Sequence, residues 1–130
     1  MIVGFTAGAF DLPHAGHVAF LEACNRQCDY LIVGLQTNPH NDREWKHIPI
    51  QSTYERWKQL ECYSNKIIPY DKEIDLENLL AIEGINVRFV GSDYEGKDFT
   101  GKNMCDRREI KIVYIPRLHT YSTSELRNRI

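Results

Sequence analysis

The sequence has no long apolar run and no excess of charge of one sign. Its 130 residues carry a net charge of −2, and the basic residues are spread along the chain, which argues against a nucleic-acid partner. The opening stretch, MIVGFTAGAF, has neither a basic segment nor an extended apolar stretch. From this pattern we expect no signal peptide, no membrane span and a cytoplasmic protein.

Cysteine is scarce and is not arranged in the pairs typical of disulfide frameworks or zinc sites. The four cysteines, Cys24, Cys28, Cys62 and Cys105, include no CxxC motif, so we expect reduced thiols in the core or on helix faces. On a regular helix His17 and Cys24 would lie roughly 10 Å apart along the axis, too far to share one ion. The sequence therefore predicts no zinc site and no other metal held by the protein itself.

Of two common phosphate-binding motifs, one is absent and the other is incomplete. No GxGxxG motif occurs, so NAD-dependent hydride transfer has no support. The stretch GSDYEGKD (91–98) fits the P-loop pattern GxxxxGK. However, Asp98 replaces the Ser or Thr that would hold magnesium, and Asp93 and Glu95 would bring negative charge into the phosphate cradle. We expect the next residues, FTGKNMC (99–105), to form a turn rather than the helix that a P-loop requires.

What is present is the pattern of an α/β protein. With 42% hydrophobic and 26% charged residues, the chain can form one core but is too short for two, so we expect one domain over residues 1–130. Apolar runs typical of buried strands lie at 2–7, 30–35, 66–70, 87–91 and 110–115. Helical spacing or capping boxes mark 17–28, 52 onward, 75–84 and 122 to the end. This alternation predicts a Rossmann-like, parallel five-stranded sheet with helices on both faces.

Three polar stretches rich in glycine or serine follow predicted strands. They are GAFDLPHAGH (8–17), GSDYEGK (91–97) and RLHTYSTS (117–124). In parallel α/β sheets, ligands bind beyond the carboxyl ends of the strands. The three stretches therefore converge on one edge of the predicted sheet, which predicts a binding site there.

The first of these stretches suits an anionic ligand. Gly8 allows a tight turn and a close approach of the backbone to a ligand. Gly16 has no side chain that would block a ligand from the start of the following helix. His14 and His17 are three residues apart, so at a helix start both can face the same way and donate to phosphate oxygens. The alternative is that one histidine caps the helix while the other is exposed to solvent.

The last stretch offers hydroxyl groups at a second helix start. Ser122 and Glu125 form a capping box, which explains them without any ligand. A capped end can still present Thr123 and Ser124 to an anion, and Arg117 lies just upstream.

The longest predicted connection, residues 36–51, carries Lys46. Loops of this length in compact domains are usually functional or mobile. A lysine on such a loop is solvated by default, but it can also close over phosphates.

These motifs resemble those of a known family. GAFDLPHAGH resembles the GxFDxxHxGH signature of the nucleotidyltransferase superfamily, and YSTSEL (121–126) resembles its second signature, xSTTxI/L. VGSDYEGKDF (90–99) is similar to the GDDWEGK segment of glycerol-3-phosphate cytidylyltransferases. The resemblance implies a cytidylyltransferase that transfers CMP from CTP to a small phosphorylated alcohol, most simply glycerol 3-phosphate, with release of pyrophosphate. It also implies Mg²⁺ entering with the nucleotide, and a homodimer.

The resemblance assigns roles to individual residues. The catalytic residues would be His14, His17, Lys46 and Arg117. The nucleotide would be bound by Gly8, Ala9, Phe10, Asp11, Gly16, Gly91, Asp93, Tyr94, Ser122, Thr123 and Ser124. Within this set, Asp11 would orient the turn, with contact to Mg²⁺ as the alternative role, and Asp93 and Tyr94 would lie at the base.

Two other functions stay open. One is adenylyl transfer from ATP to a sugar phosphate, which enzymes of the same superfamily perform. The other is a nucleotide-binding domain without catalysis, and the sequence offers one observation in its favour. The superfamily segment RYVDEV, which supplies a phosphate-binding arginine and much of the dimer contact, reads CYSNKI (62–67) in this chain.

Overall fold

The computed structural model of the protein describes residues 1–11, 14–41, 46–82, 84–117 and 128. Its strands form one parallel sheet in the order β3-β2-β1-β4-β5, which confirms the predicted fold. The strands are β1 (Val3–Gly8), β2 (Tyr30–Gln36), β3 (Lys66–Tyr70), β4 (Val87–Gly91) and β5 (Lys111–Ile115). Because β1 pairs with both β2 and β4, the strand order reverses between β1 and β4, and parallel sheets bind ligands at such switch points.

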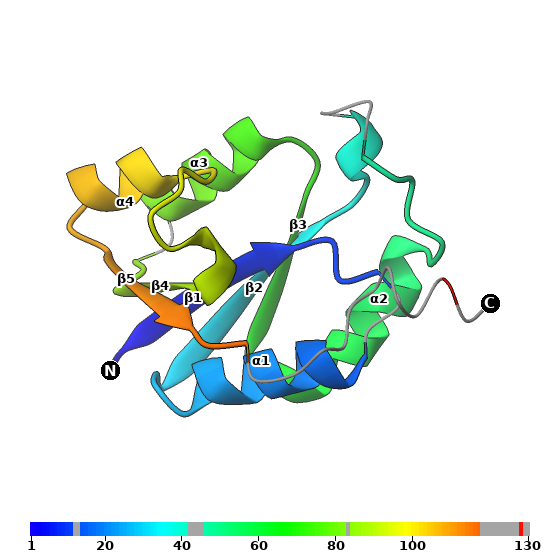
Figure 1. Cartoon of the computed structure of the whole chain (residues 1–130), viewed down its shortest axis with the longest axis horizontal. Helices are drawn as coiled ribbons and strands as arrows, with labels where there is room; N and C mark the ends of the chain where they lie inside the picture. The colour runs from blue at the N-terminus through cyan, green and yellow to red at the C-terminus, as the bar shows by residue number, and fades with distance from the viewer. Residues whose placement is uncertain (12–13, 42–45, 83, 118–127, 129–130) are drawn as a thin grey trace.

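Helices cover both faces of the sheet (Figure 1). One face carries α1 (Ala15–Asn25) and α2 (Thr53–Leu60), and the other carries α3 (Glu73–Ile82) and α4 (Lys102–Arg107). Within the described residues, short 3₁₀ turns lie between these elements at η1 (Pro39–Asn41), η2 (Glu61–Tyr63) and η3 (Ser92–Tyr94).

The central strand β2 shows why the sheet is buried on both sides. Leu31, Val33 and Leu35 pack into the apolar cluster beneath α1 and α2, and Ile32 packs into the cluster beneath α3 and α4. Successive side chains of a strand point to opposite faces, so a continuous apolar run supplies both clusters.

The element boundaries agree with the sequence-based predictions to within a few residues, with one exception. Residues 99–105 were expected to form a turn, but α4 begins at Lys102. The preceding Gly101 adopts a left-handed conformation (φ 85°) and offers no side-chain cap, so the usual signal of a helix start is absent. Cys105 anchors this helix in the core. Except for residue 128, the predicted helix from residue 122 lies outside the described residues.

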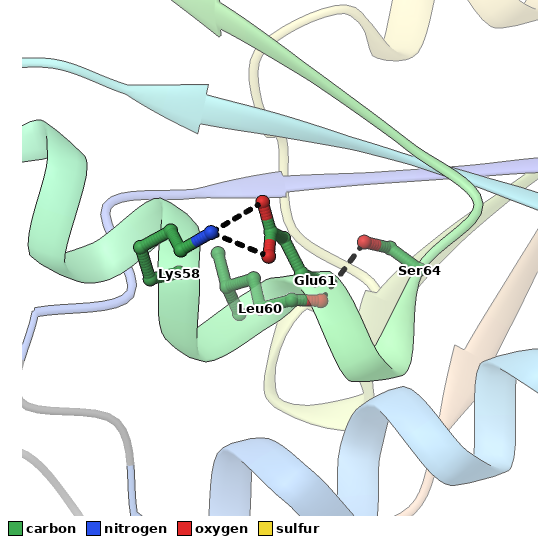
Figure 2. A network of polar contacts seen from close by, with 4 residues as sticks. All are labelled: Lys58, Leu60, Glu61 and Ser64. Carbon is green, nitrogen blue, oxygen red and sulfur yellow. Dashed lines mark hydrogen bonds and ion pairs between the residues drawn. The ribbon is translucent and has the colours of Figure 1, made fainter.

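The end of α2 is fixed by local polar contacts (Figure 2). The Ser64 hydroxyl donates to the Leu60 carbonyl at 2.9 Å and so satisfies one of the last helical acceptors. Lys58 Nζ lies 3.1 Å from Glu61 Oε2, but both side chains are about half exposed, and such pairs add little stability. The chain then turns directly into β3.

Candidate active site at the carboxyl edge of the sheet

A cavity of about 910 Å³ opens at the carboxyl ends of the strands, across the switch point. We call it the edge cavity. Of the residues predicted to bind nucleotide or to act in catalysis, its lining includes Gly8, Ala9, Phe10, Asp11, His17, Lys46, Gly91 and Tyr94. The structure therefore brings together residues from the first turn and from the end of β4, which are two of the three stretches expected to converge, and adds residues from the long loop. Most of the third stretch, 117–124, lies outside the described residues.

The two histidines form a reciprocal cap at the start of α1. His14 is the N-cap residue, and its Nδ1 accepts the backbone N–H of Gly16 at 3.0 Å. The Nδ1 of His17 accepts the backbone N–H of His14 at 3.3 Å. The two rings stack with their centroids 4.0 Å apart and an interplanar angle of 22°. The expected alternative, one capping and one exposed histidine, is wrong, because both rings cap the helix and both are partly buried.

This cap fixes the chemistry of both rings. A nitrogen that accepts a hydrogen bond carries no proton, so in each neutral imidazole the proton lies on Nε2, which is then a donor. Both donors lie at a helix N-terminus, where the backbone dipoles favour negative charge. Phe10 contacts the edge of His17 with ring centroids 5.4 Å apart, which holds the ring in place. The start of α1 can thus receive an anion.

Asp11 ties the long loop to the first turn. It is 6% exposed, and its two carboxylate oxygens each accept a backbone N–H at 3.0 Å, from Ile50 and Gln51. Lys46 and His47, at the other end of the same loop segment, line the edge cavity. Asp11 therefore positions the loop that carries Lys46, in addition to its expected role in the turn.

Arg56 on α2 is a site residue that the sequence-based prediction missed. It is 1% exposed, and burial lowers the pKa of its guanidinium, an effect that nearby Asp11 opposes. Its Nη atoms donate to the carbonyls of Ala9 at 2.9 Å, Gln36 at 2.6 Å and Thr37 at 2.6 Å. One side chain thus links the ends of β1 and β2 to α2. Its neighbours in α2 are typical of a solvated helix face, so no sequence motif marks it.

An ion pair lies at the edge of the sheet beyond β4 and β5. Arg117 Nη1 lies 3.7 Å from Asp93 Oδ2, and both side chains are largely exposed. Tyr94 contacts Phe99 edge to face, with centroids 6.1 Å apart. Of the predicted site residues that the structure describes, the lining of the edge cavity does not include His14, Gly16, Asp93 and Arg117. Ser122, Thr123 and Ser124 lie outside the described residues.

The side chains of the described segments offer no ready metal centre, since no three His, Cys, Asp or Glu residues there are grouped to hold an ion. The cysteines are free thiols, with Cys24 and Cys105 buried and Cys62 exposed. No helix in the described part of the chain is long and apolar enough to cross a membrane.

A parallel α/β sheet with a helix start at its switch point is the arrangement in which many nucleotide-binding proteins hold phosphate. The model of the cytidylyltransferase-like family matches residues 5–129. The chain belongs to the cytidylyltransferase-like family of nucleotidyltransferases.

Individual relatives agree with this family. Glycerol-3-phosphate cytidylyltransferase of Bacillus subtilis (strain 168) is 32% identical over 128 residues, which cover 96% of this chain and 94% of the relative. Bifunctional protein HldE of Hyphomonas neptunium is 29% identical over 95% of this chain, which spans only 26% of that longer relative. A lipopolysaccharide core biosynthesis protein from Thermoplasma volcanium shares the fold, with a TM-score of 0.69 at 21% identity over 94% of this chain and 99% of the neighbour.

Proposed function

We propose that the protein transfers CMP from CTP to a small phosphorylated alcohol, with glycerol 3-phosphate as the first candidate acceptor. An oxygen of the acceptor phosphate attacks the α-phosphorus of CTP, the bond from that phosphorus to the bridging oxygen breaks, and pyrophosphate leaves. The observation that carries the proposal is the histidine pair at the start of α1, whose rings cap an anion-favouring helix end through Nδ1 and so carry the proton of the neutral ring on Nε2. A relative that this chain matches over nearly its whole length bears the name of this activity.

In such a reaction the protein contributes positioning and charge stabilisation rather than covalent chemistry. His14 and His17 would donate to the phosphate oxygens as charge moves from the attacked phosphorus to the leaving group. Lys46 would neutralise the triphosphate, held in reach by the contact of Asp11 with the loop backbone. Arg117, with Ser122, Thr123 and Ser124, would bind the outer phosphates, and Asp93 and Tyr94 would lie at the base.

Mg²⁺ would enter as part of the nucleotide substrate. The described residues supply no cluster of carboxylates to hold an ion by themselves, and a hard cation of this kind is commonly bound by substrate phosphates and water. In this view the metal neutralises the triphosphate, and the protein residues orient it.

Adenylyl transfer from ATP to a sugar phosphate is the second candidate. HldE proteins match most of this chain at an identity similar to that of the cytidylyltransferase relatives, so identity alone favours neither nucleotide.

The proposal also includes a cytoplasmic location and a homodimer. Analytical ultracentrifugation would test the homodimer by measuring the mass of the protein in solution.

The experiment is pyrophosphate release in the presence of Mg²⁺. CTP, ATP, GTP and UTP are each tested against glycerol 3-phosphate, sugar phosphates and amino-alcohol phosphates, with the acceptor omitted as control. We expect turnover with CTP and a phosphorylated alcohol, and two coupled diphosphate resonances in the ³¹P spectrum of the product. Turnover only with ATP would replace the nucleotide in the proposal. Binding of CTP without turnover across the panel would support the non-catalytic alternative.

A further inference from the structure

The loop that carries Lys46 is attached to the protein at Lys46 itself. Nδ1 of His40, a residue of η1, lies 3.0 Å from the backbone carbonyl oxygen of Lys46. A carbonyl oxygen can only accept a hydrogen bond, so Nδ1 of His40 carries a proton and donates it. His14 and His17 use Nδ1 in the opposite way, as an acceptor. His40 therefore makes a directed contact with the backbone of a predicted catalytic residue.

His40 is itself held in a hydrogen-bonded turn. The carbonyl of Asn38 accepts the backbone N–H of Asn41 at 3.1 Å, and the side-chain oxygen of Asn38 accepts the backbone N–H of His40, also at 3.1 Å. Asparagine commonly forms this kind of contact with the backbone two residues further on. Pro39, within the same turn, is buried and lines the edge cavity. The turn that presents His40 is thus part of the wall of this cavity.

Asp71 joins this turn to the end of β3. Its Oδ1 accepts from the Thr37 hydroxyl at 3.1 Å and from Asn41 Nδ2 at 3.2 Å. The backbone N–H of Thr37 donates at 2.8 Å to the carbonyl of Tyr70, the last residue of β3. Hydrogen bonds therefore connect the carboxyl edge of the sheet, through η1, to the backbone of the long loop.

The contact with Asp11 would not fix Lys46 by itself. Asp11 accepts from the backbone of Ile50 and Gln51, so its nearer attachment lies four residues beyond Lys46. Four residues of extended chain reach about 13 Å, which would leave the lysine a wide range of positions. An attachment at residue 46 itself removes this freedom, and the entropy cost of ordering then falls on folding rather than on ligand binding.

We propose that His40 is a positioning residue for Lys46. By holding the carbonyl of Lys46, His40 fixes where the lysine side chain leaves the backbone, beside the edge cavity that Lys46 and His47 line. The lining of that cavity does not include His40, so His40 acts on a bound triphosphate through Lys46 and not by contact. The inference rests on the proposed function, because that function gives Lys46 its phosphate-binding role.

A merely structural role makes a different prediction. If His40 only closed the loop, replacing it would change nucleotide binding by the same factor whether or not residue 46 is a lysine. If His40 acts through Lys46, its effect on binding disappears once the ammonium group of Lys46 is removed, because residues that act as one unit are not additive. A double-mutant cycle therefore separates the two roles.

The test combines His40→Phe, His40→Asn and Lys46→Met. Phenylalanine keeps a ring but has no donor, whereas the amide nitrogen of asparagine can take the place of Nδ1. Calorimetry with CTP and Mg²⁺, and with ATP in parallel, measures the nucleotide dissociation constant in the absence of acceptor. We expect His40→Phe to weaken nucleotide binding about 3- to 12-fold, the scale of one hydrogen bond, and His40→Asn to recover most of that loss. On the Lys46→Met background, His40→Phe should change binding by less than about twofold.

A second measurement needs no variant. The ¹⁵N shifts of the imidazole nitrogens show which of them carries the proton in a neutral ring, and histidine is ordinarily neutral at a pH of about 8. We expect His40 to be protonated at Nδ1, with His14 and His17 protonated at Nε2. Protonation of His40 at Nε2 alone would overturn the inference, even if the His40→Phe protein did not fold.

Two results of the cycle would also overturn the inference, namely equal losses from His40→Phe on the wild-type and Lys46→Met backgrounds, or no loss on either. Failure of the proposed function is seen separately. Wild-type protein that shows the coupling in nucleotide binding but releases no pyrophosphate with any acceptor would contradict nucleotidyl transfer and leave the role of His40 intact. Wild-type protein that binds neither nucleotide would contradict both.

Discussion

His14 and His17 stack at 4.0 Å, and each Nδ1 accepts a backbone N–H from the first turn of α1. The two rings therefore cap the helix, and the proposed function gives the same rings a chemical role as well. In the cap each Nδ1 acts as a hydrogen-bond acceptor, so the proton of each neutral ring lies on Nε2. This division makes the two roles separable by substitution.

His14→Asn separates capping from catalysis. Asparagine is a strong N-cap residue, so the melting temperature should stay close to that of the wild type, whereas His14→Ala should cost about 1 kcal/mol of stability. Both variants lose the Nε2 donor, and we expect kcat to fall about 10²- to 10³-fold in each. Thermal unfolding and steady-state kinetics measure the two effects. Full activity in His14→Asn would remove His14 from the transition state.

Asp11→Ala should release the loop that carries Lys46. The carboxylate accepts two backbone N–H groups, and bonds to charged groups contribute about 1.5–3 kcal/mol each. We expect a lower free energy of unfolding, a higher KM for the nucleotide and faster proteolysis within residues 46–51. Asp11→Asn, which can accept only one of the two bonds, should fall between the wild type and Asp11→Ala. A KM equal to that of the wild type in both variants would show that Asp11 does not position the loop.

Arg56→Met should destabilise the protein by on the order of 3 kcal/mol, because it leaves three partly buried carbonyls without their donor. Since Ala9 and Gln36 lie at the edge cavity and accept from Arg56, nucleotide binding should weaken as well. Urea unfolding and CTP titration measure the two losses. Lys58→Met, which removes an exposed charge from the same helix, is the control and should change stability by less than about 1 kcal/mol.

The thiols should differ sharply in reactivity. Burial, with a smaller effect of Cys28, raises the pKa of Cys24 to about 12, and burial also raises the pKa of Cys105. A thiol reagent at pH 8 should modify exposed Cys62 first and reach Cys24 and Cys105 only after unfolding. Because the folded protein keeps Cys24 protonated at pH values where the unfolded chain ionises, this residue should make stability fall as pH rises above about 9. Rapid modification of Cys24 in the folded protein would contradict the packing described for α1.

Chelation should affect turnover but not the fold. With no metal cluster among the described side chains, EDTA should leave the melting temperature of the nucleotide-free protein unchanged. Turnover should stop in EDTA and return when Mg²⁺ is added in excess of the nucleotide. A melting temperature lowered by EDTA alone would reveal a resident metal.

The sheet and much of the site could be predicted from the sequence because they leave local signals. Buried parallel strands are continuous apolar runs, and α2 begins with a capping box at Ser52 and Glu55 that the structure contains. The convergence of polar stretches follows from the parallel topology alone. Helix α4 was missed because Gly101 begins it without a cap. Arg56 was missed because its role depends on carbonyls supplied by distant segments.

The central claim is that the histidine pair at the start of α1 stabilises nucleotidyl transfer. The most direct measurement compares pyrophosphate release by the wild type and by His17→Ala with saturating CTP, Mg²⁺ and glycerol 3-phosphate. The account predicts one pyrophosphate per CDP-alcohol in the wild type, and a kcat lower by at least about 10²-fold in His17→Ala with CTP binding retained. Equal kcat in the two proteins would contradict it.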